Sequence, residues 1–507
     1  MSFKYSRVLC LLIAASLLFL TWPVAAQSKL FSGFKNKSKV KAIPTFKPEQ
    51  LRADFAIFHK ALQEAHPGLY RYTSKPTFKT RFDSVYFSLS RPHTEQDFYK
   101  SLKYLVTNIR CANTILKTAN RTEPEFPYHT DQLFPVQLYF NNGKAYALNS
   151  FTDSAAVPAN AEIVAINGRK MNYQVSDLMP YVSFADGQVT SSKYRELGDN
   201  FSGYIATFGE AKPVYEITFR TGDNFRTVRA NAAKLEQVRK VKLKDEAFKK
   251  LPAWSLEFQD KKIAVLTLAT FQPDKSLPDF EEFLETAFAK IKNSEVKTLI
   301  IDLRDNKEGN DKYGALLYAY LTDKPFRFYR QINTNTNRRF TFLKYGHVPL
   351  NFFFYRRLLK MNPDSTFRYT YHSNLKEQKP QLNAFAGNLY ILQSGRTFGS
   401  AAEFAAVAHS RKRATIIGQE TAGAYRGSNG GKYVQVKLPN SKFELSIPLW
   451  AISLDVDEKQ NLNRGVLPQY PASPTSEQIL SGYDREIEFT LELIRRKNEV
   501  LENKVGE

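Results

Sequence analysis

The chain has very few cysteines: two among 507 residues. Cys10 falls in an N-terminal segment that we expect to be removed, which leaves Cys111 as the one cysteine of the mature chain. A single cysteine excludes an internal disulfide and a cysteine zinc cluster. We therefore expect no metal site and no cofactor.

Long apolar runs are also missing. After Val8–Leu20, no stretch approaches the ~20 apolar residues that a membrane span needs. Lys4 and Arg7 precede this run, and Val24-Ala-Ala26 follows it, which predicts a signal peptide over residues 1–26. We expect an exported chain, in the periplasm or outside the cell, with no transmembrane span once the signal is removed.

Acidic residues are too few to balance the basic ones, and the formal net charge is +22. The positive residues are scattered and no nucleic-acid-binding module accompanies them, so we expect no nucleic-acid partner. One cluster, formed by Lys35, Lys37, Lys39 and Lys41, lies in residues 27–45. This segment is interpreted as a solvated basic linker.

Residues 46–125 show helical periodicity. Apolar side chains recur at three- and four-residue spacing, as at Leu51, Phe55 and Phe58. His66-Pro67-Gly68 interrupts the pattern between helices. We expect a helical N-terminal domain here.

Residues 130–235 change to short strands and turns. An apolar run over 134–140 is followed by Asn142-Gly143, a hairpin signal, and further strand patterns cover 162–168 and 214–219. A small β module is expected.

Residues 250–475 alternate between strand and helix patterns. Buried-type strands over 263–268 and 298–302 enclose a helix expected at 278–292. This alternation predicts an α/β domain within a multidomain α+β chain, and residues 476–507 are expected to form a C-terminal helix.

Ser400 stands where a buried-type strand, 388–393, runs through a short loop into an Ala-rich helix. A hydroxyl at such a helix start lies beside free N–H groups, where a developing oxyanion is stabilised. Ser400-Ala-Ala-Glu403 also fits a capping box, in which the side chains of Ser400 and Glu403 each accept from the other's N–H. Both interpretations, nucleophile and helix cap, stay open at this point.

The motifs around Ser400 resemble those of the tail-specific, or C-terminal processing, serine peptidase family. Thr397-Phe-Gly-Ser-Ala-Ala-Glu403 is similar to the nucleophile segment, and 418–423 to the Gly-x-x-Thr-x-Gly that follows it. Asp302-Leu-Arg-Asp-Asn306 and Arg464-Gly-Val-Leu-Pro468 resemble two further family motifs. The resemblance implies a ClpP/crotonase-like α/β peptidase domain, a PDZ-like domain at 130–235 and a helical N-terminal cap.

The resemblance also implies roles for individual residues. Ser400 would be the nucleophile, Glu403 a second catalytic residue, and the backbone N–H groups of Ala401 and Gly309 the oxyanion hole. The implied partners are peptides or unfolded protein, including C-terminal tails that the PDZ-like domain holds by strand addition.

This chain lacks the family's general base at both positions where the family pattern places it. One branch of the family has a lysine where this chain has Ala424, and the other has a histidine where Asn113 stands. Lys432, Glu458 and Asn113 are the remaining candidates for a base or an orienting group. His129, His347 and His372 cannot be placed from the sequence.

Two functions follow. The first is an exported serine-type endopeptidase that hydrolyses peptide bonds through an acyl-enzyme on Ser400. The alternative is a catalytically degenerate member that binds peptides or other ligands in the periplasm, with Ser400 and Glu403 reduced to a helix cap. The missing base favours the alternative, as does Glu308 at a glycine position of the family pattern.

Overall fold

The computed structural model describes residues 43–119, 125–248, 252–273, 277–349 and 352–505. The expected signal peptide and nearly all of the expected basic linker lie outside these residues. Every element below belongs to Thr45–Glu507, one of the two units into which the chain divides. None of the helices in the described ranges has the length and apolar character that a membrane span needs.

The N-terminal part is helical, as expected. Ser74 and Thr94 accept from backbone N–H groups at two of the helix starts. The first helix ends immediately before His66, because Pro67 cannot continue it. The helices are α2 (Pro48–Ala65), α3 (Lys75–Ser88) and α4 (Glu95–Ile109), preceded by the short pairing of β1 (Thr45–Phe46) with β2 (His93–Thr94).

The β module is built on one antiparallel sheet in the order β4-β5-β6-β8-β9. Asn142 and Gly143 both have positive φ, 50° and 76°, which confirms the predicted hairpin between β4 and β5. The strands are β4 (Val136–Asn141), β5 (Lys144–Ser150), β6 (Glu162–Ile166), β7 (Arg169–Lys170), β8 (Val214–Thr221) and β9 (Asn224–Asn231). The sequence interpretation missed the helices α5 (Met171–Leu178) and α6 (Ser191–Phe208), and α7 (Leu235–Phe248) follows the sheet.

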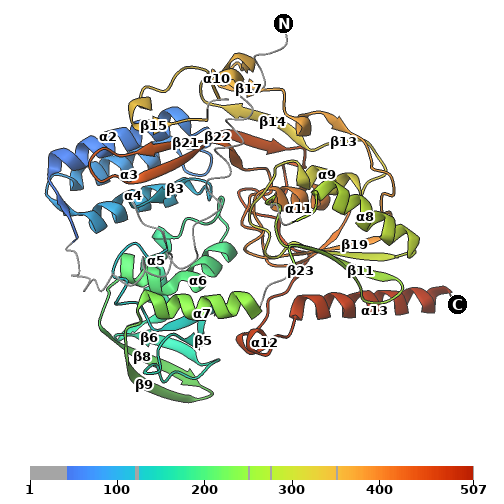
Figure 1. Ribbon diagram of the computed structural model, residues 1–507, viewed down its shortest axis with the longest axis horizontal. Helices are drawn as coiled ribbons and strands as arrows, with labels where there is room; N and C mark the ends of the chain where they lie inside the picture. Colours follow the sequence, from blue (N-terminus) through green and yellow to red (C-terminus); the bar gives the residue numbers. More distant parts are fainter. Residues whose placement is uncertain (1–42, 120–124, 249–251, 274–276, 350–351, 506–507) are drawn as a thin grey trace, which may run out of the picture. The chain divides into compact units, whose positions relative to one another are not determined.

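The α/β sheet has the order β10-β11-β12-β19-β20-β23, and all its neighbours from β11 onward pair in parallel. Alternate side chains such as Val265, Ile300 and Leu392 face the C-terminal helix α13 (Arg485–Val505) and form one core with Ile494. Figure 1 shows α13 on one side of this sheet and α8, α9 and α11 on the other. The strands are β10 (Trp254–Phe258), β11 (Ile263–Leu268), β12 (Thr298–Asp302), β19 (Asn388–Gln393), β20 (Thr415–Gly418) and β23 (Tyr470–Pro471); the helices are α8 (Phe280–Asn293), α9 (Tyr313–Ala319), α11 (Ser400–Ser410) and α12 (Ser476–Ser481).

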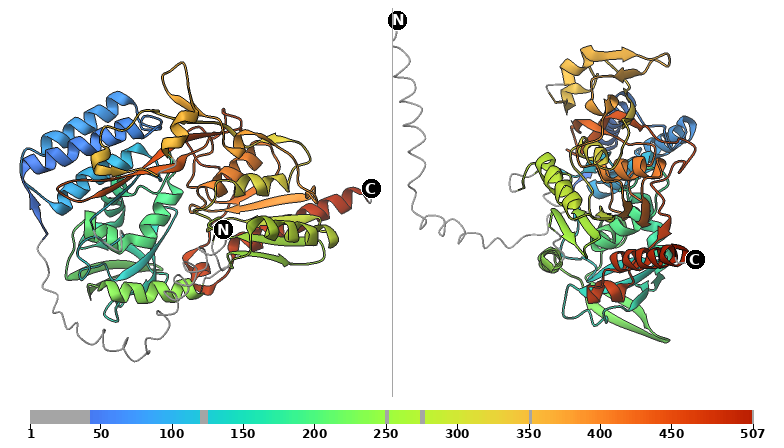
Figure 2. Two further views of the ribbon diagram at one scale, coloured as in Figure 1. Left: turned by 45° about the horizontal axis from the view of Figure 1, so that its top comes forward. Right: turned by 90° about the vertical axis from the view of Figure 1, so that its right-hand side faces the viewer.

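A further sheet, with seven strands, was not foreseen. Its longest strands, β21 (Asn429–Lys437) and β22 (Glu444–Leu454), pack beside α2, and Figure 2 shows these strands next to the N-terminal helices. β3 (Ile115–Lys117) pairs with β22, so the segment after α4 joins this sheet. The other strands are β14 (Tyr329–Thr334), β15 (Gly346–His347), β16 (Leu359–Met361) and β17 (Phe367–Tyr369); β13 (Phe326–Arg327) pairs with β18 (Glu377–Gln378), and α10 is Phe352–Tyr355.

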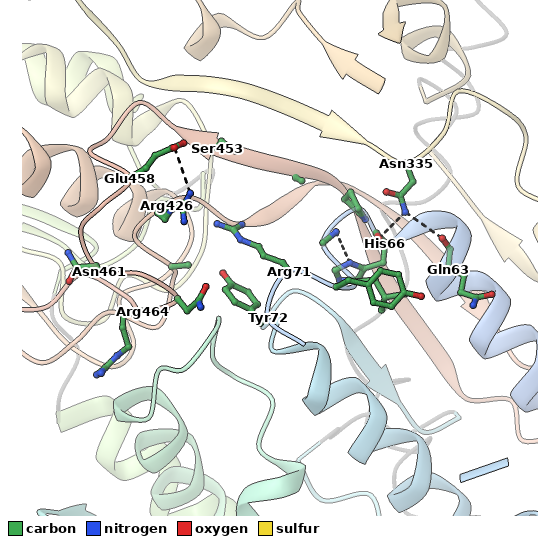
Figure 3. A pocket seen from close by; sticks show the side chains of 17 residues that line it. Gln63, His66, Arg71, Tyr72, Asn335, Arg426, Ser453, Glu458, Asn461 and Arg464 are labelled. Atoms are coloured by element: carbon green, nitrogen blue, oxygen red, sulfur yellow. Dashed lines mark hydrogen bonds and ion pairs between the residues drawn. The ribbon is translucent and has the colours of Figure 1, made fainter. Parts of the chain in front are cut away.

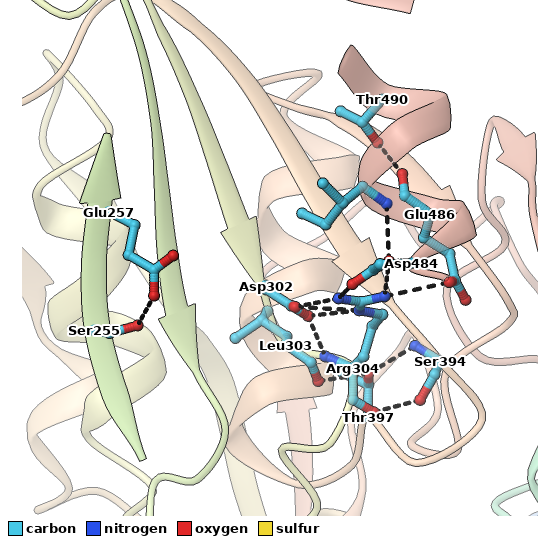
Figure 4. Close-up of polar contacts among 11 residues, drawn as sticks. Ser255, Glu257, Asp302, Leu303, Arg304, Ser394, Thr397, Asp484, Glu486 and Thr490 are labelled. Carbon is cyan, nitrogen blue, oxygen red and sulfur yellow. Dashed lines mark hydrogen bonds and ion pairs between the residues drawn. The ribbon is translucent and has the colours of Figure 1, made fainter. Parts of the chain in front are cut away.

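Arg304 ties the loop after β12 to the start of α13. Its guanidinium donates to Asp302 at 2.6 Å, to Asp484 at 2.7 Å and to Glu486 at 3.2 Å (Figure 4). The Arg304 side chain is only 15% exposed, so these charge-assisted bonds are poorly screened. Asp302 and Arg304, two residues of the predicted Asp302–Asn306 motif, thus stabilise the packing of α13 against the sheet.

Candidate active site

Ser400 is the first residue of α11. The loop before it is fixed by Thr397, whose hydroxyl donates to the carbonyl of Leu303 at 2.9 Å and accepts from the N–H of Ser394. Gly399 precedes the helix with φ 59° and ψ −136°, a conformation that favours glycine. The turn leaves Ser400 6% exposed at the N-terminal end of the helix.

The helix-cap interpretation of Ser400 is wrong. The capping position is held by Gly399, whose carbonyl accepts from the N–H of Glu403 at 3.0 Å. The Glu403 carboxylate points elsewhere, because it accepts from the hydroxyl of Tyr329 at 2.7 Å and from that of Ser428 at 3.0 Å. Neither side chain of the expected capping box is used as a cap.

The Ser400 hydroxyl instead contacts Gly314, at the start of α9. The Gly314 N–H donates to Ser400 Oγ at 3.0 Å. A Cβ at position 314 would stand 2.7 Å from Ser400 Oγ, closer than carbon and oxygen atoms approach without bonding, so this contact depends on glycine. An N–H aimed at the oxygen favours the alkoxide form of the serine.

The expected oxyanion residues are Ala401 and Gly309. Ala401 follows Ser400 in the first turn of α11, where N–H groups lack intrahelical partners. Gly309 has a φ of 142° and forms a parallel β-bridge with Phe271. A Cβ at position 309 would overlap the Phe271 backbone. Glu308 is exposed. The assignment of Ala401 and Gly309 to an oxyanion hole stays a prediction.

Asn113 lies in the loop between α4 and β3. The preceding Ala112 packs against Phe398 and Ala422, which places the loop beside the nucleophile segment. The Asn113 amide donates to the carbonyl of Asn429 at 2.6 Å. The loop therefore packs beside the nucleophile segment, but its asparagine is engaged with a backbone group.

The other two proposed base candidates have partners of their own. Lys432 Nζ lies 5.5 Å from the ring centre of Tyr355. Glu458 forms ion pairs with Arg330 and, at 3.8 Å, with Arg426. Within the described part of the chain, the structure gives neither of them a contact with the Ser400 hydroxyl.

The two family-like segments after the nucleophile lie together. Glu420 accepts two hydrogen bonds from the Arg464 guanidinium, at 2.8 and 2.6 Å, and one from the Gly465 N–H. Gln469, where the family has an aspartate, accepts from the N–H of Ile416 at 2.7 Å. The segments 418–423 and 464–468 thereby form one wall beside α11.

Asp186 is a site residue that the sequence analysis missed. Its carboxylate accepts from the N–H of Ala112 at 2.9 Å and from that of Ala424 at 3.4 Å. It therefore joins the loop of Asn113 to the position of the family's lysine. Burial raises the pKa of Asp186 to about 6, although these N–H donors and Arg71 oppose the rise. The Asp-Gly turn at 186–187 was the only local signal.

Glu403 is the site carboxylate with a pKa near neutrality. Burial raises its pKa to about 7, and the hydrogen bonds from Tyr329 and Ser428 act in the opposite direction. The aromatic ring of Tyr329 packs against His372, with ring centres 5.3 Å apart. Tyr329 and His372 come from the segment between α9 and β19, which carries no motif, and Ser428 directly precedes β21.

His372 is held by Asp311 and Asn374. Its Nδ1 accepts from the Asn374 N–H at 3.1 Å, so its Nε2 carries the proton and donates to Asp311 at 3.0 Å. Both ring nitrogens are thus occupied, and the sequence could not have placed this histidine. In the described ranges, no group of three or more histidine, cysteine, aspartate or glutamate side chains is arranged to hold a metal ion.

A nucleophile-type serine at the carboxyl end of a parallel strand, before a helix, defines a serine hydrolase-like α/β site. Residues 262–444 match the model of peptidase family S41. The segment that carries Ser400 is therefore similar to this family, in agreement with the resemblance of its motifs. A comparison with curated protein sequences finds no relative.

Solved structures share the fold. A mutant of CPAF matches with a TM-score of 0.59 and 13% identity, over 86% of this chain and 95% of that one. Mature CPAF complexed with lactacystin matches with a TM-score of 0.58 and 15% identity, over 91% of this chain and 99% of that one. The likeness confirms the mixed α/β multidomain fold class, while the PDZ-like identity of residues 130–235 stays a prediction.

Proposed function

We propose that the protein is an exported serine-type endopeptidase that cleaves peptides or unfolded protein chains, with Ser400 as its nucleophile. The observation that carries this proposal is the position of the Ser400 hydroxyl, which serves no capping role and accepts the N–H of Gly314. A hydroxyl kept at a helix start by a glycine contact suits attack on a carbonyl group.

In the proposed reaction, Ser400 Oγ forms a bond to the carbonyl carbon of the substrate. The peptide C–N bond then breaks, the amine leaves with a proton, and water releases the acyl group. Glu403 takes up the serine proton, because its pKa of about 7 suits a base at neutral pH. Ser400 and Glu403 lie three residues apart on α11 and therefore on one side of the helix.

The proposed substrate class rests on the family resemblance and on the edge strand β4. β4 is the edge strand of its sheet, and a hollow of about 260 Å³ lies between β4 and α6. An extended chain can add to such an edge by backbone hydrogen bonding. This supports peptide or unfolded protein, including C-terminal tails, as the substrate.

One observation favours the alternative function, a ligand-binding protein without catalysis. The Asn113 amide, at the position of the family's histidine, donates to the Asn429 carbonyl and carries no basic atom. Ala424 offers no amine at the other family position.

Hydrolysis of a fluorescein-labelled unfolded protein by the purified chain separates the two functions. We expect release of labelled peptides that Ser400→Ala reduces to background. Ser410→Ala, at the other end of α11, is the matched control and is expected to keep the activity. No hydrolysis by the unaltered chain would support the binding function instead.

A further inference from the structure

A polar cavity lies beside the wall that the segments 418–423 and 464–468 form. It has a volume of about 470 Å³ and is lined by the loop after α2, the segment 424–426 and the loop 458–464 (Figure 3). Its lining contains three arginines, Arg71, Arg426 and Arg464, and one carboxylate, Glu458.

Arg71 differs from the other two arginines in its pairing. Arg464 donates two hydrogen bonds to Glu420, and Arg426 lies 3.8 Å from Glu458, which also pairs with Arg330. Within the described ranges, the structure gives the Arg71 guanidinium no hydrogen bond or ion pair, and only the Tyr72 ring lies against it. A guanidinium has five N–H donors, so a half-buried one without acceptors favours an anion.

The charges around the cavity leave a positive excess. Figure 3 shows the Arg71 side chain extending from its loop toward the side of the cavity that Arg426 lines. Burial raises the pKa of the Tyr72 hydroxyl, and both arginines oppose that rise, which places both near the same group. The buried Asp186 carboxylate attracts Arg71 electrostatically. Its oxygens, however, accept hydrogen bonds from the N–H groups of Ala112 and Ala424 and, among the described residues, none from Arg71.

The rest of the lining suits a peptide rather than a single ion. Asn461 and Asn463 line the cavity, and their side-chain amides can bond to backbone groups of a bound chain, whereas the Asn335 amide already donates to the carbonyl of His66 at 2.9 Å. Ala424 belongs to the cavity wall, and a Cβ at the adjacent Gly423 would meet Ala402 of α11. The cavity and the nucleophile helix therefore share a wall.

We propose that this cavity binds the free α-carboxylate of a peptide, with Arg71 and Arg426 as its ligands. The presence of an anion site is independent of catalysis, whereas the choice of a peptide as the occupant rests on the proposed function. Arginine binds a carboxylate with two parallel hydrogen bonds, which gives both charge and orientation. A chain bound here by its terminus would extend along the shared wall toward α11.

The test measures binding without turnover. The full chain carrying Ser400→Ala is titrated against a fluorescein-labelled decapeptide with a free C-terminus, and against the same peptide as a C-terminal amide. Fluorescence anisotropy is expected to show about tenfold or more weaker binding of the amide. Because binding is read in the absence of the nucleophile, a failure of the peptidase proposal does not affect this result.

Variants assign the effect to the cavity. Arg71→Gln is expected to weaken binding of the free acid to the level of the amide, and Arg426→Gln gives a second variant should the first fold poorly. Arg91→Gln, in an exposed loop, is the matched control and should leave the difference intact. Thermal unfolding of each variant checks its fold.

Other outcomes overturn the proposal. A preference for the free acid that survives both cavity variants would place carboxylate recognition elsewhere, as in the β module. Equal binding of an amide that ends in glutamate would show a site for side-chain carboxylates. Equal or undetectable binding of the free acid and the amide would also contradict the proposal. So would displacement of both peptides by millimolar inorganic phosphate when neither peptide binds more tightly than the other.

Discussion

The backbone N–H of Gly314 donates a 3.0 Å hydrogen bond to the Oγ of Ser400, which lies 86 residues later in the sequence. The bond joins the first turn of α9 to the first turn of α11, two helices that follow neighbouring parallel strands. It shows that the serine hydroxyl is positioned by a second helix and not by its own.

Gly314→Ala is expected to displace the Ser400 side chain, because the new Cβ would stand 2.7 Å from Oγ and 2.6 Å from the Ser400 carbonyl oxygen. Such overpacking costs about 1–3 kcal/mol of stability. Misplacement of a catalytic group by about 1 Å lowers rates about a hundredfold. The rate of fluorophosphonate labelling and thermal unfolding measure the two effects.

Gly346→Ala is the control for this substitution. The nearest atom to its added Cβ, other than its chain neighbours, is a carbonyl oxygen 3.1 Å away, and the residue lies in the short strand β15. We expect its labelling rate to equal that of the unaltered chain. Equal rates for both glycine variants would contradict the role given to Gly314.

Glu403→Gln tests the buried carboxylate through its pH dependence. Burial raises the pKa of Glu403 from 4.5 to about 7. Between these values the folded protein holds a proton that the unfolded chain has released, so the free energy of unfolding falls as the pH rises. The stabilisation is full below pH 4.5 and is lost by about pH 7, a change on the order of 3 kcal/mol.

Urea denaturation at pH 5 and pH 8 measures this effect as the difference between Glu403→Gln and the unaltered chain. We expect the variant to gain relative stability at the higher pH, because glutamine has no proton to lose. Taking the difference cancels the titration of Asp186 and other groups. A difference that is the same at both pH values would show that Glu403 has an ordinary pKa.

Part of this site and fold could be predicted because the signals are local. Asn142-Gly143 specifies a hairpin turn, and the strand, loop and helix around Ser400 are consecutive in the sequence. The helix α6 was missed because it contains Gly198 and Gly203, which lower helix propensity. The structure shows why position 203 requires glycine, because a Cβ there would stand 2.0 Å from the carbonyl oxygen of Glu125.

The environment of Glu403 could not be predicted for a different reason. Tyr329 reaches Glu403 from β14, and Ser428 precedes β21, so both contacts depend on how the seven-stranded sheet is assembled. His372 and Asp311 come together across 61 residues. Non-local pairing of this kind leaves no periodicity or motif in the sequence.

Asp186→Asn is expected to destabilise the protein at pH 7.5. The ionised carboxylate accepts from two backbone N–H groups, whereas an amide has one oxygen to offer and places an NH₂ group against the other donor. A buried donor left unpaired costs about 1–3 kcal/mol. Chemical denaturation measures this loss.

Asp177→Asn is the matched control in the same part of the chain. Its side chain is 52% exposed and pairs with Arg169 at the surface, so we expect a change within about 0.5 kcal/mol. If both asparagine variants cost equally little, Asp186 is not the link between the loop of Asn113 and the wall at Ala424.

The most direct measurement of the central claim is labelling of the purified chain with a serine-reactive fluorophosphonate. The account predicts one labelled residue, which Ser400→Ala abolishes and Ser410→Ala leaves unchanged, with both variants folded by thermal unfolding. Absence of labelling in the unaltered chain, or labelling that persists in Ser400→Ala, would contradict it.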